Sequence, residues 1–176
     1  ALKPEELVSR SRNIESSLEY MRQTYPEVGH WIDSLQAAEA LHDLYIENDE
    51  GTPLHALYVP AAASTNHTSV IVHGYTDNSI RMMMIGYLYN RQLGYNILLP
   101  DLYGHGLSRG TEVQMGWKDR LDVLRWTEEA NHLFGGNTEM VVHGISMGAA
   151  TTMCVSGEVQ QGIYQQPFIK CFVEDC

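Results

Sequence analysis

Residues 139–150, with the sequence EMVVHGISMGAA, decide the fold class of this 176-residue chain. An apolar run typical of a buried strand leads into Gly144-Ile-Ser146-Met-Gly148, and a segment typical of a helix follows it. A serine on so tight a strand-to-helix turn needs small residues two positions away, because larger side chains would collide with the strand and the helix. The pattern therefore predicts a nucleophile elbow, with Ser146 projecting above the sheet and its backbone strained at positive φ. The alternative interpretation is a glycine-flanked helix cap without chemistry.

Apolar runs alternate with helical segments on both sides of this turn. Strands are expected at 69–74, 95–101, 139–144 and 168–176, and helices at about 79–93, 117–134 and 147–156. Asp77 or Asn78 is positioned to cap the first helix, and Gly94, Gly136 and Gly157 are positioned to end the three helices. Continuous apolar strands separated by amphipathic helices indicate parallel strands that are buried on both faces.

The first 60 residues have a different pattern. Two amphipathic helices are expected at 4–24 and about 27–40, and alternating apolar and polar residues at 41–59 predict a β-hairpin. The fold class is therefore α/β, a mostly parallel sheet with helices on both faces and an antiparallel N-terminal hairpin. We divide the chain into an N-terminal helical extension, 1–40, and a layered domain, 41–176.

Composition excludes several classes of function. The chain has 11 Lys and Arg against 22 Asp and Glu, a formal net charge of -11, so we expect no nucleic-acid partner. No apolar run approaches the roughly 18 residues that span a bilayer. Because the sequence begins at Ala1 rather than Met, a removed N-terminal leader or anchor stays open, and otherwise the protein is expected to be soluble in an unknown compartment. The three cysteines are interpreted as buried thiols.

A second motif, His73-Gly74-Tyr75, ends the first parallel strand. An esterase needs two backbone N–H donors for the oxyanion of its tetrahedral intermediate. One comes from the residue after the nucleophile, here Met147, and the other from the loop after an earlier strand. Tyr75 is placed to supply that second donor, and Gly74 lets the backbone approach. We interpret the side chain of His73 as structural.

The third motif is DLYGHGLS, residues 101–108, directly after the apolar run NILLP. Together the three motifs resemble the α/β-hydrolase superfamily, in particular its serine esterase, lipase and peptidase branch. The resemblance covers about 41–176 and corresponds to the N-terminal half of that fold, ending after the strand that follows the nucleophile helix. It implies that Asp101 and Ser108 are structural residues beside the site.

One part of the family pattern is missing. In this fold the catalytic triad follows the order Ser, then Asp or Glu, then His, and none of the eight histidines follows Ser146. Glu158, Glu174 and Asp175 are the acids after it, and a minority of the family places the acid where Glu174 or Asp175 stands. We expect the acid and the His base to come from beyond residue 176, together with the remainder of the same fold.

The leading hypothesis is a serine hydrolase that acts on a carboxylic ester, or on a thioester or amide, as a carboxylesterase does. Its partner is then a small-molecule ester or acyl substrate, and neither a cofactor nor a metal is implied. The alternative is a non-catalytic α/β-hydrolase-like binding or interaction protein that keeps the turn around Ser146. The sequence does not indicate the acyl-chain preference or the oligomeric state.

Overall fold

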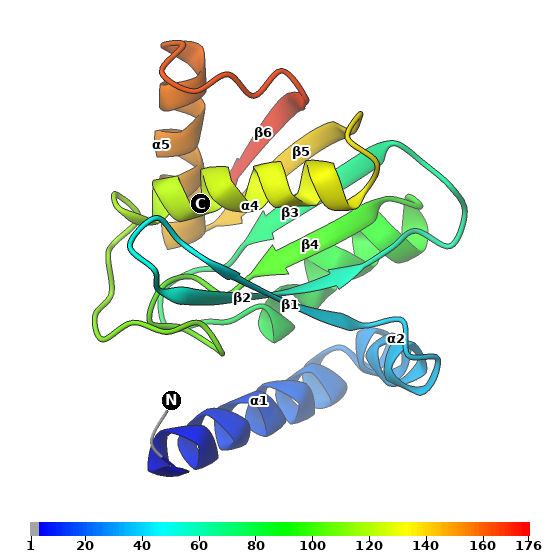
Figure 1. Cartoon of the computed structure of the whole chain (residues 1–176). Coiled ribbons are helices and arrows are strands. Elements are labelled where there is room, and N and C mark those ends of the chain that lie inside the picture. The colour runs from blue at the N-terminus through cyan, green and yellow to red at the C-terminus, as the bar shows by residue number, and fades with distance from the viewer. Residues whose placement is uncertain (1–3) are drawn as a thin grey trace.

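The computed structural model describes residues 4–176, and residues 1–3 of the expected helical extension lie outside the described residues. Its centre is a six-stranded sheet with the order β1-β2-β4-β3-β5-β6 (Figure 1). The strands are β1 His42–Glu47, β2 Pro53–Val59, β3 His67–Val72, β4 Asn96–Pro100, β5 Glu139–Ile145 and β6 Ile169–Asp175.

Among the described strands, β2 alone runs opposite to the others. The first three neighbours, β1, β2 and β4, pair antiparallel, whereas β4, β3, β5 and β6 are all parallel. In the middle of the sheet Val70 of β3 lies opposite Val142 of β5, and both side chains are fully buried. The expected fold class, a mostly parallel α/β sheet with an antiparallel N-terminal hairpin, is confirmed.

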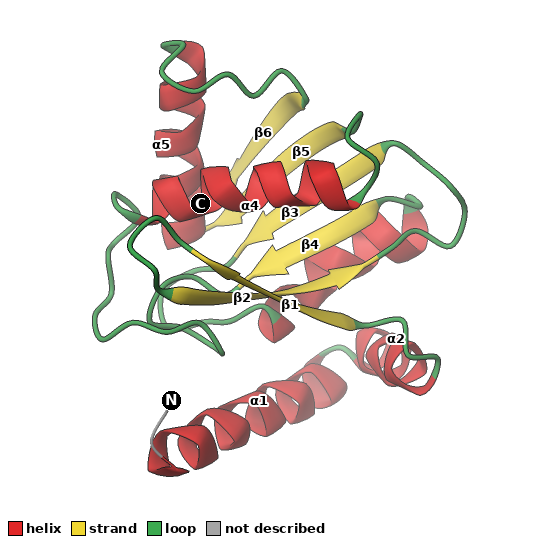
Figure 2. Ribbon diagram, viewed as in Figure 1, coloured by secondary structure: helices red, strands yellow, loops and turns green. Residues whose placement is uncertain are grey.

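Helices cover both faces of the sheet (Figure 2). They are α1 Pro4–Thr24, α2 Pro26–Ala37, the short turns η1 Ile80–Met82 and α3 Met83–Gly86, η2 Tyr87–Gln92, α4 Asp119–Leu133 and α5 Met147–Gln160. On one face, α4 and α5 bury Trp126 and Val155 against Val72 and Val142. On the other face, the first helices and the η1–α3 turns bury Ile32 and Met83 in a second core with strand residues. The sheet is therefore buried between two apolar layers, as the continuous apolar strands predict.

Two helices differ from the prediction. The helix after the serine turn does not end at Gly157 but continues to Gln160. A Cβ on Gly157 would meet no atom within 4 Å, so this glycine is on an open helix face, where it weakens a helix without ending it. The helix ends before Gly162, whose φ of 71° is the left-handed conformation that terminates helices. The segment expected as one helix at 79–93 is instead a succession of 3-10, α and π turns.

The interpretation of the cysteines as buried thiols is wrong. Cys171 and Cys176 are exposed and Cys154 is partly exposed. Cys171 lies on β6, which pairs with β5 alone among the described strands, so one side of that strand is uncovered. Among residues 4–176, no helix is long and apolar enough to cross a membrane.

Candidate active site

Ser146 occupies the turn between β5 and α5 and is exposed. Its backbone has φ 56° and ψ −116°, a conformation that side-chain-bearing residues rarely adopt. This is the strained geometry that the sequence predicts, because a strand that ends at Ile145 and a helix that starts at Met147 leave one residue for the reversal. No hydrogen bond from the Ser146 hydroxyl to any described residue is recorded, so the hydroxyl is open to a ligand.

The glycines around Ser146 are required by close packing. A Cβ on Gly148 would collide with the carbonyl oxygen of Val72, at the end of β3. A Cβ on Gly144 would collide with the carbonyl oxygen of Gly148 and the hydroxyl of Thr152. Most of these obstacles are backbone atoms, which cannot rotate away as a flexible side chain can. Both positions therefore need glycine, for the reason expected from sequence.

The loop after β3 lies directly beside the serine. A Cβ on Gly74 would be 3.3 Å from the Ile145 carbonyl oxygen and 3.4 Å from the Ser146 Cβ. Tyr75 follows Gly74, and the loop hydrogen bonds of the described residues do not use its backbone N–H. Met147 is the first residue of α5, so its N–H has no acceptor within that helix. The two expected oxyanion donors thus belong to segments that flank the serine.

His73 has the structural position that we expected for its side chain. The ring is fully buried, its Nδ1 donates to the Gly74 carbonyl at 2.7 Å, and its Nε2 accepts the Leu102 N–H at 2.9 Å. Burial lowers the pKa of His73 to about 4, so the ring is neutral at physiological pH. His73 therefore joins the loop after β3 to the loop after β4.

Asp101 and Ser108 fix the loop that follows β4. Asp101 is almost fully buried, and its two carboxylate oxygens accept the backbone N–H of Ser79 at 2.8 Å and of Leu107 at 3.0 Å. The Ser108 hydroxyl accepts the His55 N–H at 2.8 Å and donates to the Asp101 carbonyl. Neither side chain contacts Ser146 in the recorded hydrogen bonds, consistent with the structural role that the resemblance implies.

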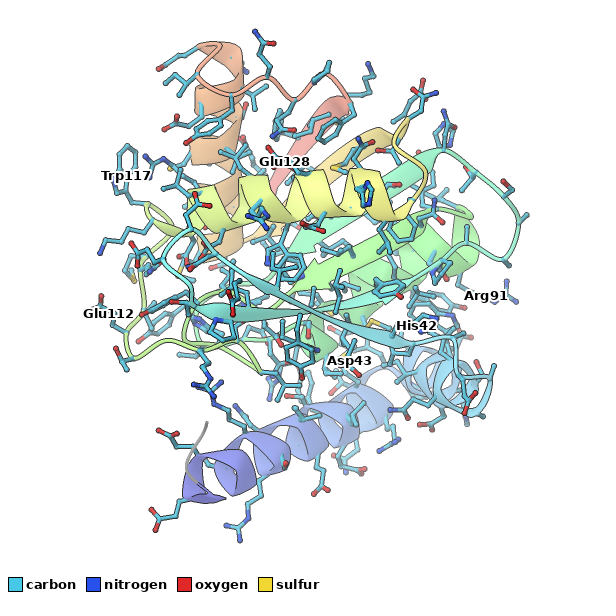
Figure 3. All side chains as sticks on the ribbon, in the orientation of Figure 1. His42, Asp43, Arg91, Glu112, Trp117 and Glu128 are labelled. Carbon is cyan, nitrogen blue, oxygen red and sulfur yellow. The ribbon has the colours of Figure 1, made fainter. Side chains whose placement is uncertain are left out.

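Sequence reasoning missed His55, on β2. Its Nδ1 lies 2.6 Å from an Asp101 oxygen and its Nε2 lies 2.6 Å from an Asp43 oxygen. Burial alone would lower the pKa of His55, but its hydrogen bonds and charge interactions with Asp101 and Asp43 outweigh burial and raise it. The sequence signal that could have found His55 is the register of the hairpin, which sets Tyr45 opposite His55. Asp43, two residues before Tyr45 on β1, then lies beside the His55 ring (Asp43 is labelled in Figure 3).

The three acids that follow Ser146 have different surroundings. Glu158 pairs with Arg120 at 2.8 Å, away from the serine turn. Glu174 is exposed on β6, opposite Gly144. Asp175 lies beside the turn, because its carbonyl accepts the Ser146 N–H at 2.8 Å, and its carboxylate is 3.8 Å from Nε2 of His143.

His143 does not reach Ser146 in the recorded hydrogen bonds. Its Nδ1 is 2.9 Å from the Tyr89 hydroxyl, and the two rings pack edge to face. Burial lowers the pKa of His143, although Asp175 acts in the opposite direction. The ring is therefore part of the packing between β5 and the helical turns after β3, as its place within the strand predicts.

Comparison with known proteins supports the relationship by fold. No protein-family model matches the chain. The chain is 29% identical over 100 residues to the uncharacterized protein YqkD of Bacillus subtilis. The matched region covers 57% of this chain and 32% of YqkD. It thus spans about a third of the length of that relative.

Solved structures give a broader match. The esterase Pf2001 of Pyrococcus furiosus is similar over 77% of this chain and 50% of its own, with a TM-score of 0.59 and 24% identity. XC6422 of Xanthomonas campestris, an α/β serine hydrolase without a lid, is similar over 68% of this chain and 57% of its own, with a TM-score of 0.57 and 17% identity. The chain therefore has the α/β-hydrolase fold, and it spans about half the length of these proteins.

Proposed function

We propose that the protein is a serine hydrolase in which Ser146 attacks the carbonyl carbon of a carboxylic ester. The observation that carries the proposal is the conformation of Ser146, which is exposed and has a positive φ of 56° directly before α5. A strained residue costs on the order of 1–3 kcal/mol and persists where the surrounding structure enforces it, most often at functional sites. The esterase and serine hydrolase among the structural neighbours add support to this class of activity.

The oxyanion that forms during the attack needs donors that are already in position. We assign them to the backbone N–H groups of Met147 and Tyr75, since both flank the serine and neither has an acceptor among residues 4–176. The N-terminus of α5 adds a partial positive charge at the same point. One such donor contributes about 10²- to 10³-fold to the rate.

The serine also needs a base to accept its proton and an acid to orient that base. No histidine among residues 4–176 has a recorded hydrogen bond to Ser146. We therefore assign the base to a histidine beyond residue 176, in keeping with the order Ser, acid, His of this fold. The acid also comes from beyond residue 176, with Asp175 as the alternative because its backbone already contacts Ser146.

Hydrolysis of p-nitrophenyl acetate and butyrate by the natural full-length protein tests this function. Ser146→Ala is expected to reduce kcat by at least about 10³-fold, because the covalent step loses its nucleophile. Ser156→Ala, on the same helix, is the matched control and is expected to leave the rate unchanged. Equal rates for Ser146→Ala and the unchanged protein would overturn the proposal.

The same assay separates the enzyme from a non-catalytic binding protein with this fold. A binding protein would hydrolyse neither ester above the rate of buffer, and Ser146→Ala would change nothing. Thioesters and amides with the same acyl groups then test the reaction class, since attack on an ester, thioester or amide carbonyl uses the same nucleophile and oxyanion donors.

A further inference from the structure

A cavity of about 280 Å³ lies between the N-terminal helices and the antiparallel edge of the sheet. Helix α1, which lies along that edge in Figure 1, forms one wall with Ile14 and Leu18. Arg10 of the same helix donates to the backbone carbonyls of Gly106 and Ser108, which anchors α1 to the loop after β4. The cavity is thus lined by segments that are far apart in the sequence, from Ile14 of α1 to Leu107 of the loop after β4.

Six aliphatic side chains line the cavity. They are Ile14, Leu18, Leu41, Leu57, Ile80 and Leu107. At roughly 30 Å³ for each water-sized group, the volume holds about nine groups. The cavity therefore fits a short alkyl chain rather than a large ligand or an aromatic cofactor.

Polar groups meet at one end of this apolar space. His55 has a carboxylate oxygen 2.6 Å from each ring nitrogen, from Asp101 and from Asp43. A carboxylate can only accept, so the protonated His55 ring donates to both carboxylates. In that state one positive and two negative charges leave this end of the cavity with a net charge of -1.

Of the two carboxylates, that of Asp43 can still accept a hydrogen bond from a ligand. The oxygens of Asp101 already accept two backbone N–H groups and His55. Asp43 uses one oxygen for His55, and no other hydrogen bond to its carboxylate is recorded among the described residues. Its side chain is 58% exposed and lines the cavity, so the carboxylate is accessible to a ligand.

Charge decides which head group this end can bind. Neither a lysine nor an arginine is among the described residues that line the cavity, and His55 is already paired with Asp43 and Asp101, so a ligand carboxylate or phosphate would meet like charge. An ammonium group would instead form a charge-assisted hydrogen bond with Asp43. The side-chain carbonyl of Gln36, which also lines the cavity, offers a second acceptor for an N–H.

We propose that this cavity binds a short aliphatic primary amine, with its ammonium group on Asp43 and its chain between α1 and the sheet. The described residues that line the cavity include none of Gly74, Tyr75, Ser146 and Met147. The site is therefore separate from the proposed catalytic serine, and its test does not depend on hydrolase activity.

Isothermal titration calorimetry of the natural full-length protein with hexylamine tests the site, with 1-hexanol and hexanoate as matched ligands. Hexylamine is expected to bind and to raise the melting temperature, because a ligand of the folded state stabilises it. The alcohol and the carboxylate are expected to bind at least about tenfold more weakly. The alcohol cannot form the charge-assisted hydrogen bond, and the carboxylate is repelled by Asp43.

Variants then locate the bound amine. Asp43→Asn keeps the shape of the side chain and is expected to raise Kd about tenfold, whereas Glu47→Gln removes the same charge from the same strand and is expected to leave it unchanged. Ile14→Phe and Leu18→Trp, each checked for a cooperative melt, fill the cavity and are expected to abolish binding. Ser146→Ala is expected to bind as the unchanged protein does. Absence of hexylamine binding, equal binding of hexanoate, or insensitivity to Asp43→Asn would overturn the proposal.

Discussion

Two loops at the carboxyl end of the sheet use polar residues in opposite ways. In the loop after β4, Asp101 and Ser108 are buried, and their hydrogen bonds tie together the strand β2, the loop and the segment after β3. In the turn after β5, Ser146 is exposed and its hydroxyl has no hydrogen-bond partner in the described part of the chain, while glycines and backbone atoms shape the turn. The first loop stabilises the edge of the sheet, and the second leaves the Ser146 hydroxyl without a hydrogen bond among the described residues.

The largest loss of stability is expected from a change in the loop after β4, where Asp101 and Ser108 are buried and hydrogen-bonded. Asp101→Asn places an amide donor among the donors that surround this position and leaves His55 with one carboxylate partner. Breaking such a buried pair costs about 3–5 kcal/mol of the free energy of unfolding, measured by urea denaturation. Asp33→Asn breaks an exposed pair with Arg22 and is expected to cost less than about 1 kcal/mol. Equal losses from the two changes would contradict the contrast.

A somewhat smaller loss of stability is expected from changing a glycine in the turn after β5. Gly148→Ala forces a methyl group against the carbonyl of Val72 and is expected to cost about 3 kcal/mol. Gly157→Ala, nine residues further along the same helix, meets no atom within 4 Å and is expected to stabilise by about 0.8 kcal/mol. Urea midpoints of the two variants compare them directly, and a neutral Gly148→Ala would mean that the turn is not tightly packed.

His55 and His73 are expected to change the stability with pH by a smaller amount and in opposite directions. The raised pKa of His55 means that its stabilisation is present below about pH 6.5, the unfolded pKa, and is lost as pH rises through the folded pKa. His73, with a pKa of about 4, instead loses stability as pH falls from about 6.5 towards 4.

Urea midpoints between pH 4 and pH 9 measure this pair of effects. The combined contribution of His55 and His73 is expected to be greatest near pH 6.5, and His55→Gln is expected to remove its decline on the alkaline side while keeping the acid side. Asp43, Asp101 and the Tyr45 ring face His55, so Asp43→Asn is expected to weaken the same alkaline decline. A decline that survives in His55→Gln would assign it to another group.

The open turn could be predicted from sequence because its constraints are local. Gly144, Ser146 and Gly148 lie within five residues, and the strand and helix on either side follow from their apolar patterns. The same local pattern gave the end of the helix incorrectly, since a single glycine on an open face is compatible with a continuing helix.

The hydrogen bonds of the loop after β4 could be predicted only in part. The motif at 101–108 indicated structural residues, but the partner of Asp101 is His55, 46 positions away, and the third member is Asp43. These residues meet because β2 is antiparallel to both β1 and β4, and that order of strands is set by tertiary packing. The hairpin register indicates the contact of His55 with Asp43, but no spacing along the chain encodes its contact with Asp101.

Labelling with a fluorophosphonate tests the contrast between the two loops, and the proposed function, most directly. The probe reacts with a serine whose hydroxyl is open and activated by a base. In the natural full-length protein, peptide mass mapping is expected to find the adduct on Ser146 and not on Ser108, which is buried and hydrogen-bonded. Ser146→Ala is expected to abolish labelling. An adduct on another serine, or undiminished labelling of Ser146→Ala, would contradict the assignment of Ser146 as the nucleophile.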